Sequence, residues 1–236
     1  MTVNDISNIL REWLHEPGKL NVRMIEAEDG RELIQLRIEL GILQMELHGR
    51  PDGVQQDGFS SLLELFRERG THGGLDADMC RRLREEGVQR SHRAAALFAM
   101  NRWEDVIRDC LQSLELFDLC NQHANEVHDR DALEQFRAPV IALRVRSAAE
   151  WAMSMENTTG AMSAIEEGLE ALREVLGDEC EESNEMQLLR GMKEALVPRL
   201  PTSERADLQE RLAAAIINEN YELAAILRDE IRLLRE

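Results

Sequence analysis

The sequence is poor in two kinds of residue, and each shortage argues against a class of protein. Aromatic residues make up only 4% of the 236 residues. Because sheets favour aromatic and β-branched side chains, we expect a mainly helical fold. Lysine occurs only at Lys19 and Lys193, and the formal net charge is −18. A field of that sign repels phosphate backbones and anionic lipids, so we expect neither direct nucleic-acid binding nor membrane binding.

Long hydrophobic runs and paired cysteines are missing as well. No apolar run approaches the roughly 20 residues that cross a bilayer. The first residues, MTVNDISNILREWLHE, have neither the basic start nor the apolar core of a signal peptide. The four cysteines form no CxxC pair; they are Cys80, Cys110, Cys120 and Cys180. We therefore expect reduced thiols in a cytoplasmic protein.

Residues 1–57 are predicted to form an N-terminal module of one helix and a β-hairpin. Every second residue from Ile34 to Leu40 is apolar, as in a strand with one buried face. A three-residue loop, EDG, would pair Met24 with Ile34 and form one continuous apolar face, whereas a two-residue loop would pair Met24 with Gln35. We predict the three-residue loop. A lone hairpin is marginal in water, so its face needs a helix or a second copy as cover.

Residues 58–200 show only helical periodicity and are predicted to form the main domain. One long helix begins at about residue 76 and is weakly broken at Gly87. Further helices cover about 103–127 and 131–155, and another ends at Leu176. The acidic stretch GDECEESNE is expected to be a solvated loop. The last helix of the domain ends at VPRLP, which predicts a hinge.

Two helical stretches of this domain align without a gap, starting at positions 102 and 157. Both resemble the second helix of a tetratricopeptide repeat, with its pattern A-x3-F-x2-A-L. The pattern positions are filled by Val106, Cys110, Ser113 and Leu114, and by Ala161, Ile165, Gly168 and Leu169. Small residues there let neighbouring helices approach closely. The resemblance implies an antiparallel helical array. The two copies start 55 residues apart, at 102 and 157, whereas the family repeats about every 34 residues. An ordinary helical bundle is the alternative.

Motifs for catalysis and metal binding are absent from the sequence. It has no G-x4-G-K-[ST], no G-x-G-x-x-G, no H-E-x-x-H and no G-x-S-x-G. We predict no catalytic residue, no metal site and no cofactor, and a protein that is not an enzyme. Cys120, His123 and His128 are at most a fragment of a metal site, since zinc takes four ligands. Five clustered arginines either bind phosphate or an acidic partner, or form ordinary surface salt bridges; they are Arg81, Arg82, Arg84, Arg90 and Arg93.

Residues 203–236 have the pattern of two short amphipathic helices joined at about 218–220. The stretch LQERLAAAIINENYELAAILRDEIRLLRE resembles the UVR motif, the helical hairpin of the excision-repair proteins UvrB and UvrC. In that family, UVR hairpins pair with one another within or between chains. The resemblance therefore implies a docking element, in which Leu212 and Ile216 face the second helix. The implied partner-binding positions are Leu212, Ile216, Tyr221, Ala224, Leu227, Ile231 and Leu234. The alternative is a last helix folded back onto its own bundle.

These patterns predict a mainly α fold: an antiparallel, tetratricopeptide-like helical array with a small N-terminal β-hairpin and a C-terminal helical hairpin. We expect a non-enzymatic adaptor that binds protein partners, among them UVR-motif proteins. One alternative is an accessory factor in nucleotide excision repair that acts through UvrB- or UvrC-like partners. Another is an enzyme whose site no motif reveals. A homodimer is expected, through the hairpin face between Leu20 and Leu40 or through the outer stripe of the UVR hairpin.

Overall fold

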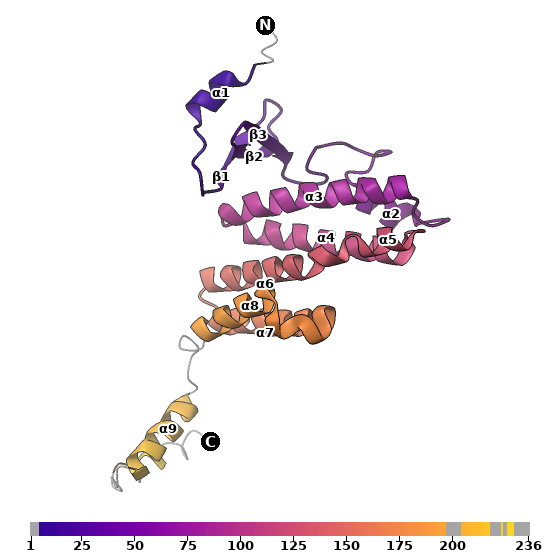
Figure 1. Cartoon of the computed structure of the whole chain (residues 1–236). Helices are drawn as coiled ribbons and strands as arrows, with labels where there is room; N and C mark the ends of the chain where they lie inside the picture. Colours follow the sequence, from indigo (N-terminus) through magenta and orange to yellow (C-terminus); the bar gives the residue numbers. More distant parts are fainter. Residues whose placement is uncertain (1–4, 197–203, 218–222, 224–225, 229–236) are drawn as a thin grey trace. The chain divides into compact units, whose positions relative to one another are not determined.

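The structure is a computed structural model that describes residues 5–196, 204–217, 223 and 226–228 (Figure 1). It is mainly α-helical, which confirms the predicted fold class. Its contacts divide the chain into two compact units, Met1–Lys193 and Glu194–Glu236. The finer division into residues 1–57, 58–200 and 203–236 stays a prediction.

The first unit begins with one short helix and a three-stranded antiparallel sheet. These elements are α1 (Ser7–Glu12), β1 (Asn21–Glu26), β2 (Glu32–Ile38) and β3 (Gly41–Glu46), and the strand order is β1-β2-β3. Met24 pairs with Ile34, as predicted. The loop between β1 and β2 includes Gly30, whose φ of 81° favours glycine. The prediction of a two-stranded hairpin is wrong in one respect, because β3 pairs with β2 as a third strand.

The remaining regular secondary structure of the first unit is helical (Figure 1). The helices are α2 (Leu62–Arg69), α3 (Ala77–Ala99), α4 (Trp103–His123), α5 (Val127–Asp131), α6 (Arg137–Ser154), α7 (Thr158–Leu176) and α8 (Asn184–Leu196), with the short 3₁₀ helices η1 (Glu134–Phe136) and η2 (Gly177–Glu182). The last of them, α8, ends beyond the unit boundary at Lys193. α3 packs on α4, α4 on α6, and α6 on α7. None of the described helices is both long and apolar enough to cross a membrane.

Two local predictions differ from these helices. Gly87 does not interrupt α3, which runs through it without a break. A glycine costs a helix only about 1 kcal/mol relative to alanine, and packing of the long helix outweighs that cost. The acidic stretch predicted as a loop contains η2, since its backbone closes short turns before α8 begins.

The caps at Asp76 and Asn157 set the starts of α3 and α7, where each side chain accepts a backbone N–H.

The predicted internal repeat is present as two helical hairpins, α3–α4 and α6–α7, with the same turn. Asn101 and Glu156 occupy equivalent positions, and both have a φ of 58°. The next residue in each turn donates its N–H back to the preceding helix. The N···O distance is 3.0 Å from Arg102 to Leu97 and 2.9 Å from Asn157 to Ala152. The resemblance to tetratricopeptide repeats itself stays a prediction.

One face of the sheet is covered by α3 and α4. Ile34 and Met45 of the sheet share a buried cluster with Leu97 of α3 and Val106 of α4. The cover predicted for this face is therefore a helical surface of the same unit. The helices bury the middle of this face at Ile34 and Leu36, so the expectation that it lacks a cover within the chain is wrong there. At the end of the face, Leu20, Ile38 and Leu40 are 54%, 41% and 91% exposed.

Candidate partner-binding site

The second unit contains the segment that resembles a UVR hairpin. α9 covers Glu204–Ile217, and the described residues at 223 and 226–228 are helical too. Leu208 and Ala215 of α9 form a buried cluster with Leu227, and Leu212 packs against it. The buried positions on α9 follow a helical spacing of about one per turn, which places them on one face. The two helical segments therefore meet along a thin apolar seam.

Apolar side chains also lie on the outside of this hairpin. The exposed fractions are 52% for Ile216, 40% for Leu223 and 54% for Ile226. Ile216 follows directly after buried Ala215, so on a helix it is turned by about 100° from the seam. The expectation that Ile216 faces the second helix is therefore wrong. Exposed apolar residues on a unit with so small a core are typical of a binding surface.

The structure places the remaining predicted partner-binding residues in different ways. Leu227 is 1% exposed and lies inside the seam of the hairpin. Leu212 is partly buried at the same seam. Tyr221, Ala224, Ile231 and Leu234 lie outside the described residues. Leu223 and Ile226 are exposed residues that the sequence reasoning missed. In the sequence, each of them is an apolar residue directly next to a position of the predicted seam. That position beside the seam is the signal that could have identified them as exposed.

The arginine cluster on α3 is not an open basic patch. Arg90 and Arg93 are fully buried, at 1% and 0% exposure. Arg93 makes a two-pronged ion pair with Asp109 of α4, with N···O distances of 2.7 and 2.8 Å. Its third nitrogen donates to the carbonyl of Glu46 in β3, at 2.8 Å. Arg90 pairs with buried Glu86 on its own helix. The expectation of ordinary surface salt bridges is wrong for these two residues.

The other three arginines of the cluster have polar partners as well. Arg81 pairs with Asp78 and Glu85, Arg82 donates to Gln56, and Arg84 pairs with Asp129. The carboxylates compensate most of the positive charge of the cluster. An approaching phosphate would compete with these existing pairs, so the cluster as a whole gives little support to phosphate binding, although the pair of Arg84 with Asp129 uses only Nη1 of the guanidinium.

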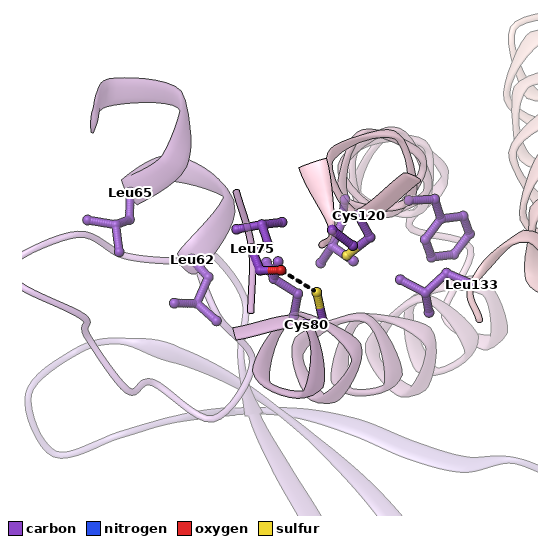
Figure 2. Close-up of a cluster of buried hydrophobic side chains, with 10 residues drawn as sticks. Leu62, Leu65, Leu75, Cys80, Cys120 and Leu133 are labelled. Atoms are coloured by element: carbon purple, nitrogen blue, oxygen red, sulfur yellow. Dashed lines mark hydrogen bonds between the residues drawn. The ribbon is translucent and has the colours of Figure 1, made fainter. Parts of the chain in front are cut away.

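The cysteines of α3 and α4 belong to the core. Figure 2 shows Cys80 and Cys120 among Leu62, Leu75 and Leu133. The Cys80 thiol donates to the Leu75 carbonyl, with an S···O distance of 3.8 Å. Burial raises the pKa of Cys120 to about 12, so this thiol stays protonated near neutral pH. Within the described residues, no group of three or more His, Cys, Asp or Glu is arranged to hold a metal ion.

Comparison with known families gives one match. Residues 202–236 match the family model described as the UvrB/uvrC motif. No curated protein and no solved structure matches the chain. The matched segment coincides with the hairpin that exposes Ile216, Leu223 and Ile226. Over residues 202–236, therefore, the chain carries a UVR motif.

Proposed function

We propose that the protein is a non-enzymatic adaptor that docks protein partners through its UVR hairpin and its helical array. The observation that carries the proposal is the UVR match over residues 202–236, on a unit whose hairpin exposes large apolar side chains. Burial of such side chains is worth about 25 cal/mol per Å² of apolar surface removed from water. A partner with a complementary apolar face would gain that free energy.

A second UVR hairpin is the partner that best fits this surface. In a two-fold dimer, each copy buries the same patch of the other, so one self-complementary patch is sufficient. The net charge of −18 per chain opposes association. At physiological salt, screening over about 8 Å weakens the repulsion between distant carboxylates. A specific interface buries about 800 Å² per partner, and we propose that the hairpin provides its centre.

Light scattering of the full chain at micromolar concentration tests the dimer. We expect a mass of twice 27.0 kDa for the wild type. The double variant Ile216→Asp/Ile226→Asp should have a mass of 27.0 kDa, because each new carboxylate would be buried without a partner. Val54→Asp is the matched control, since Val54 lies in the first unit and is 52% exposed, as Ile216 is. A wild-type monomer would overturn the homodimer, and dissociation of the control would overturn the hairpin as its site.

The UVR match also favours a second candidate, an accessory role in nucleotide excision repair through UvrB- or UvrC-like proteins. The net charge and the paired arginines of α3 argue against direct contact with DNA. The test is calorimetric titration of the chain with UvrB- and UvrC-like proteins, beside a gel shift with duplex DNA at low salt. Binding to the proteins that Ile216→Asp/Ile226→Asp removes would support this role. Tight, salt-sensitive binding to DNA would instead support a direct nucleic-acid function.

We propose that the protein is located in the cytoplasm. All four cysteines are free and buried, and free thiols are typical of a reducing compartment. Fractionation of cells that express the tagged chain tests this part of the proposal. Recovery with the membrane or secreted fraction would contradict it.

A further inference from the structure

A pocket of about 320 Å³ lies in the first unit between α3, α4 and the segment from η1 to α6. It separates two buried clusters of the helical array. Phe117 and Leu133, which line the pocket, belong to one cluster, and Ala94 and Cys110, which also line it, belong to the other. The helices are thus held together on both sides of a space that their own side chains leave unfilled.

Small residues create this space. Gly87, Ser91 and Ala94 follow one another at helical spacing along α3, and Cys110 and Ser113 line the opposite wall on α4. Glycine is not required at position 87 for close packing. A Cβ atom there would meet only Leu116, at an ordinary contact distance of 3.8 Å. Gly87 therefore leaves volume in the pocket and does not serve to bring two helices together.

The walls are mainly apolar, and the rim carries large apolar side chains in contact with water. Val88 and Phe136 line the pocket and are 54% and 49% exposed. Val140 and Leu143 of α6 complete the apolar wall. Binding sites for small molecules have this character, with volumes from about 300 Å³ and a few polar groups that fix orientation. A ligand here would remove exposed apolar surface from water.

The polar groups of the pocket select the ligand. The structure describes every residue that lines the pocket, and Arg84 is the one charged residue among them. Arg84 donates from Nη1 to Asp129, a residue of α5 that is almost fully buried. A guanidinium has five N–H donors in a planar fork, so donors remain for a second acceptor. The hydroxyls of Ser91 and Ser113 already donate to backbone carbonyls. An acceptor-bearing ligand therefore suits the Arg84 end of the pocket.

We propose that this pocket binds a small, mainly apolar carboxylate, with the carboxylate at Arg84 and the hydrocarbon part against Phe117, Val140 and Leu143. A carboxylate accepts charge-assisted hydrogen bonds from a guanidinium, which are stronger than bonds between neutral groups. The site lies within the helical array of the first unit. It makes no use of the UVR hairpin, so the inference goes beyond the proposed adaptor function and can fail or hold independently of it.

Paired titrations with octanoate and octylammonium test the proposal, because the two probes share one chain and differ in the charged end. The full chain carries a net charge of −18, so non-specific attraction favours the ammonium probe. A preference for octanoate of about tenfold or more in calorimetry would therefore report the guanidinium of Arg84. Methyl resonances of Val88, Val140 and Leu143 should shift on titration with octanoate and locate the ligand in the pocket.

Three variants localise the effect. Ser91→Trp places a large side chain at an exposed lining position and should weaken octanoate binding about tenfold or more. Arg84→Gln/Asp129→Asn should abolish the preference for octanoate. Both residues are changed together because loss of Arg84 alone would leave buried Asp129 uncompensated. Arg81→Gln, an exposed arginine of the same helix, is the control and should bind octanoate as the wild type does.

Circular dichroism establishes that each variant is folded. If the double variant does not fold, Arg84→Lys serves in its place. It keeps the charge but loses the planar fork, and it should weaken octanoate binding several-fold. Equal or tighter binding of octylammonium by the wild type would overturn the proposal. So would the absence of pocket shifts with octanoate, a result that would instead leave the pocket to an apolar side chain of a protein partner.

Discussion

The α3–α4 and α6–α7 hairpins share one turn geometry, but different contacts hold their helices together. Between α3 and α4, Arg93 and Asp109 form an ion pair in which both side chains are 0% exposed. The structure describes α6 and α7 in full, and Ser147 is the one buried polar side chain on these two helices. There the helices meet at Gly168, where a Cβ atom would lie 2.3 Å from a methyl carbon of Val145.

The turn and the helix contact are therefore separate determinants of the hairpin. The turn depends on a few backbone hydrogen bonds and one residue with positive φ, and both hairpins have these. The contact depends on what the facing positions carry. A buried ion pair requires both partners, because either charge alone is costly in the interior. A glycine contact requires only the absence of a side chain. The two hairpins should therefore respond differently to substitution.

Breaking the buried ion pair should have the largest effect. Arg93→Met leaves buried Asp109 with only its longer contact to Arg108, at 3.4 Å, and we expect the free energy of unfolding to fall by about 3–5 kcal/mol. The double variant Arg93→Met/Asp109→Leu should recover part of that loss, because no uncompensated charge remains. Arg81→Met, which removes two exposed pairs, should cost at most about 1 kcal/mol. Urea unfolding measures all three, and equal losses for Arg93→Met and Arg81→Met would contradict the structural role of the buried pair.

Alanine at the two glycines should have opposite consequences in the two hairpins. Gly168→Ala forces a Cβ atom against the stiff side chain of Val145, and we expect a loss of about 1–3 kcal/mol from overpacking. Gly87→Ala meets only ordinary contacts and should raise stability by up to about 1 kcal/mol through helix propensity. Thermal and urea unfolding of both variants provide the comparison. Stabilisation by Gly168→Ala would show that the α6–α7 contact does not need glycine.

Alkaline pH should weaken the α3–α4 hairpin through its thiols. Burial raises the pKa of Cys110 from 9.0 to about 12. Above pH 9 the unfolded chain releases the proton while the folded chain keeps it, so stability is full below pH 9 and falls as the pH rises towards 12. The expected slope is about 1.4 kcal/mol per pH unit for each such thiol. Urea unfolding between about pH 8 and 10.5 should show a shallower slope for Cys110→Ala. Ser147→Ala, a change in α6, should keep the wild-type slope.

Two single variants, each giving one turn the residue type of the other, should change the free energy of unfolding least. Both turn residues have positive φ, a conformation that asparagine tolerates better than glutamate. Glu156→Asn should therefore raise the free energy of unfolding by up to about 1 kcal/mol, and Asn101→Glu should lower it by a similar amount. The two variants control for each other. Changes of the same sign in urea unfolding would show that the turns differ in more than backbone conformation.

Local patterns were sufficient to predict several of these elements. Alternation of apolar residues fixed the pairing of Met24 with Ile34, because a shift of one residue would have moved every apolar side chain to the other face. Small residues at helical spacing revealed the repeat of two hairpins, including the close contact at Gly168. The UVR resemblance predicted the segment that the family model matches. In each case the signal lies within a short stretch of chain.

Other features depend on residues that are distant in sequence. β3 was missed because Ile42 and Leu43 break the alternation, and because its turn, Glu39-Leu40, lacks the usual glycine or asparagine. The buried state of Arg93 was missed because its partners lie on another helix and in the sheet. The pocket arises where three elements separated along the chain leave volume between them. Periodicity along one segment carries no information about such contacts.

The bonds that α3 and α4 make to the end of β3 have a consequence for aggregation. β3 is an outer strand, and an outer strand with unpaired backbone groups can recruit a strand of another chain. The N–H of Glu46 donates to the Pro51 carbonyl, and its own carbonyl accepts from Arg93. The next carbonyl, of Leu47, accepts from Arg108. The guanidinium of Arg93 and a proline turn thus occupy the two main-chain groups of Glu46 that a foreign strand would need, so this end of the sheet is protected against growth into a fibril.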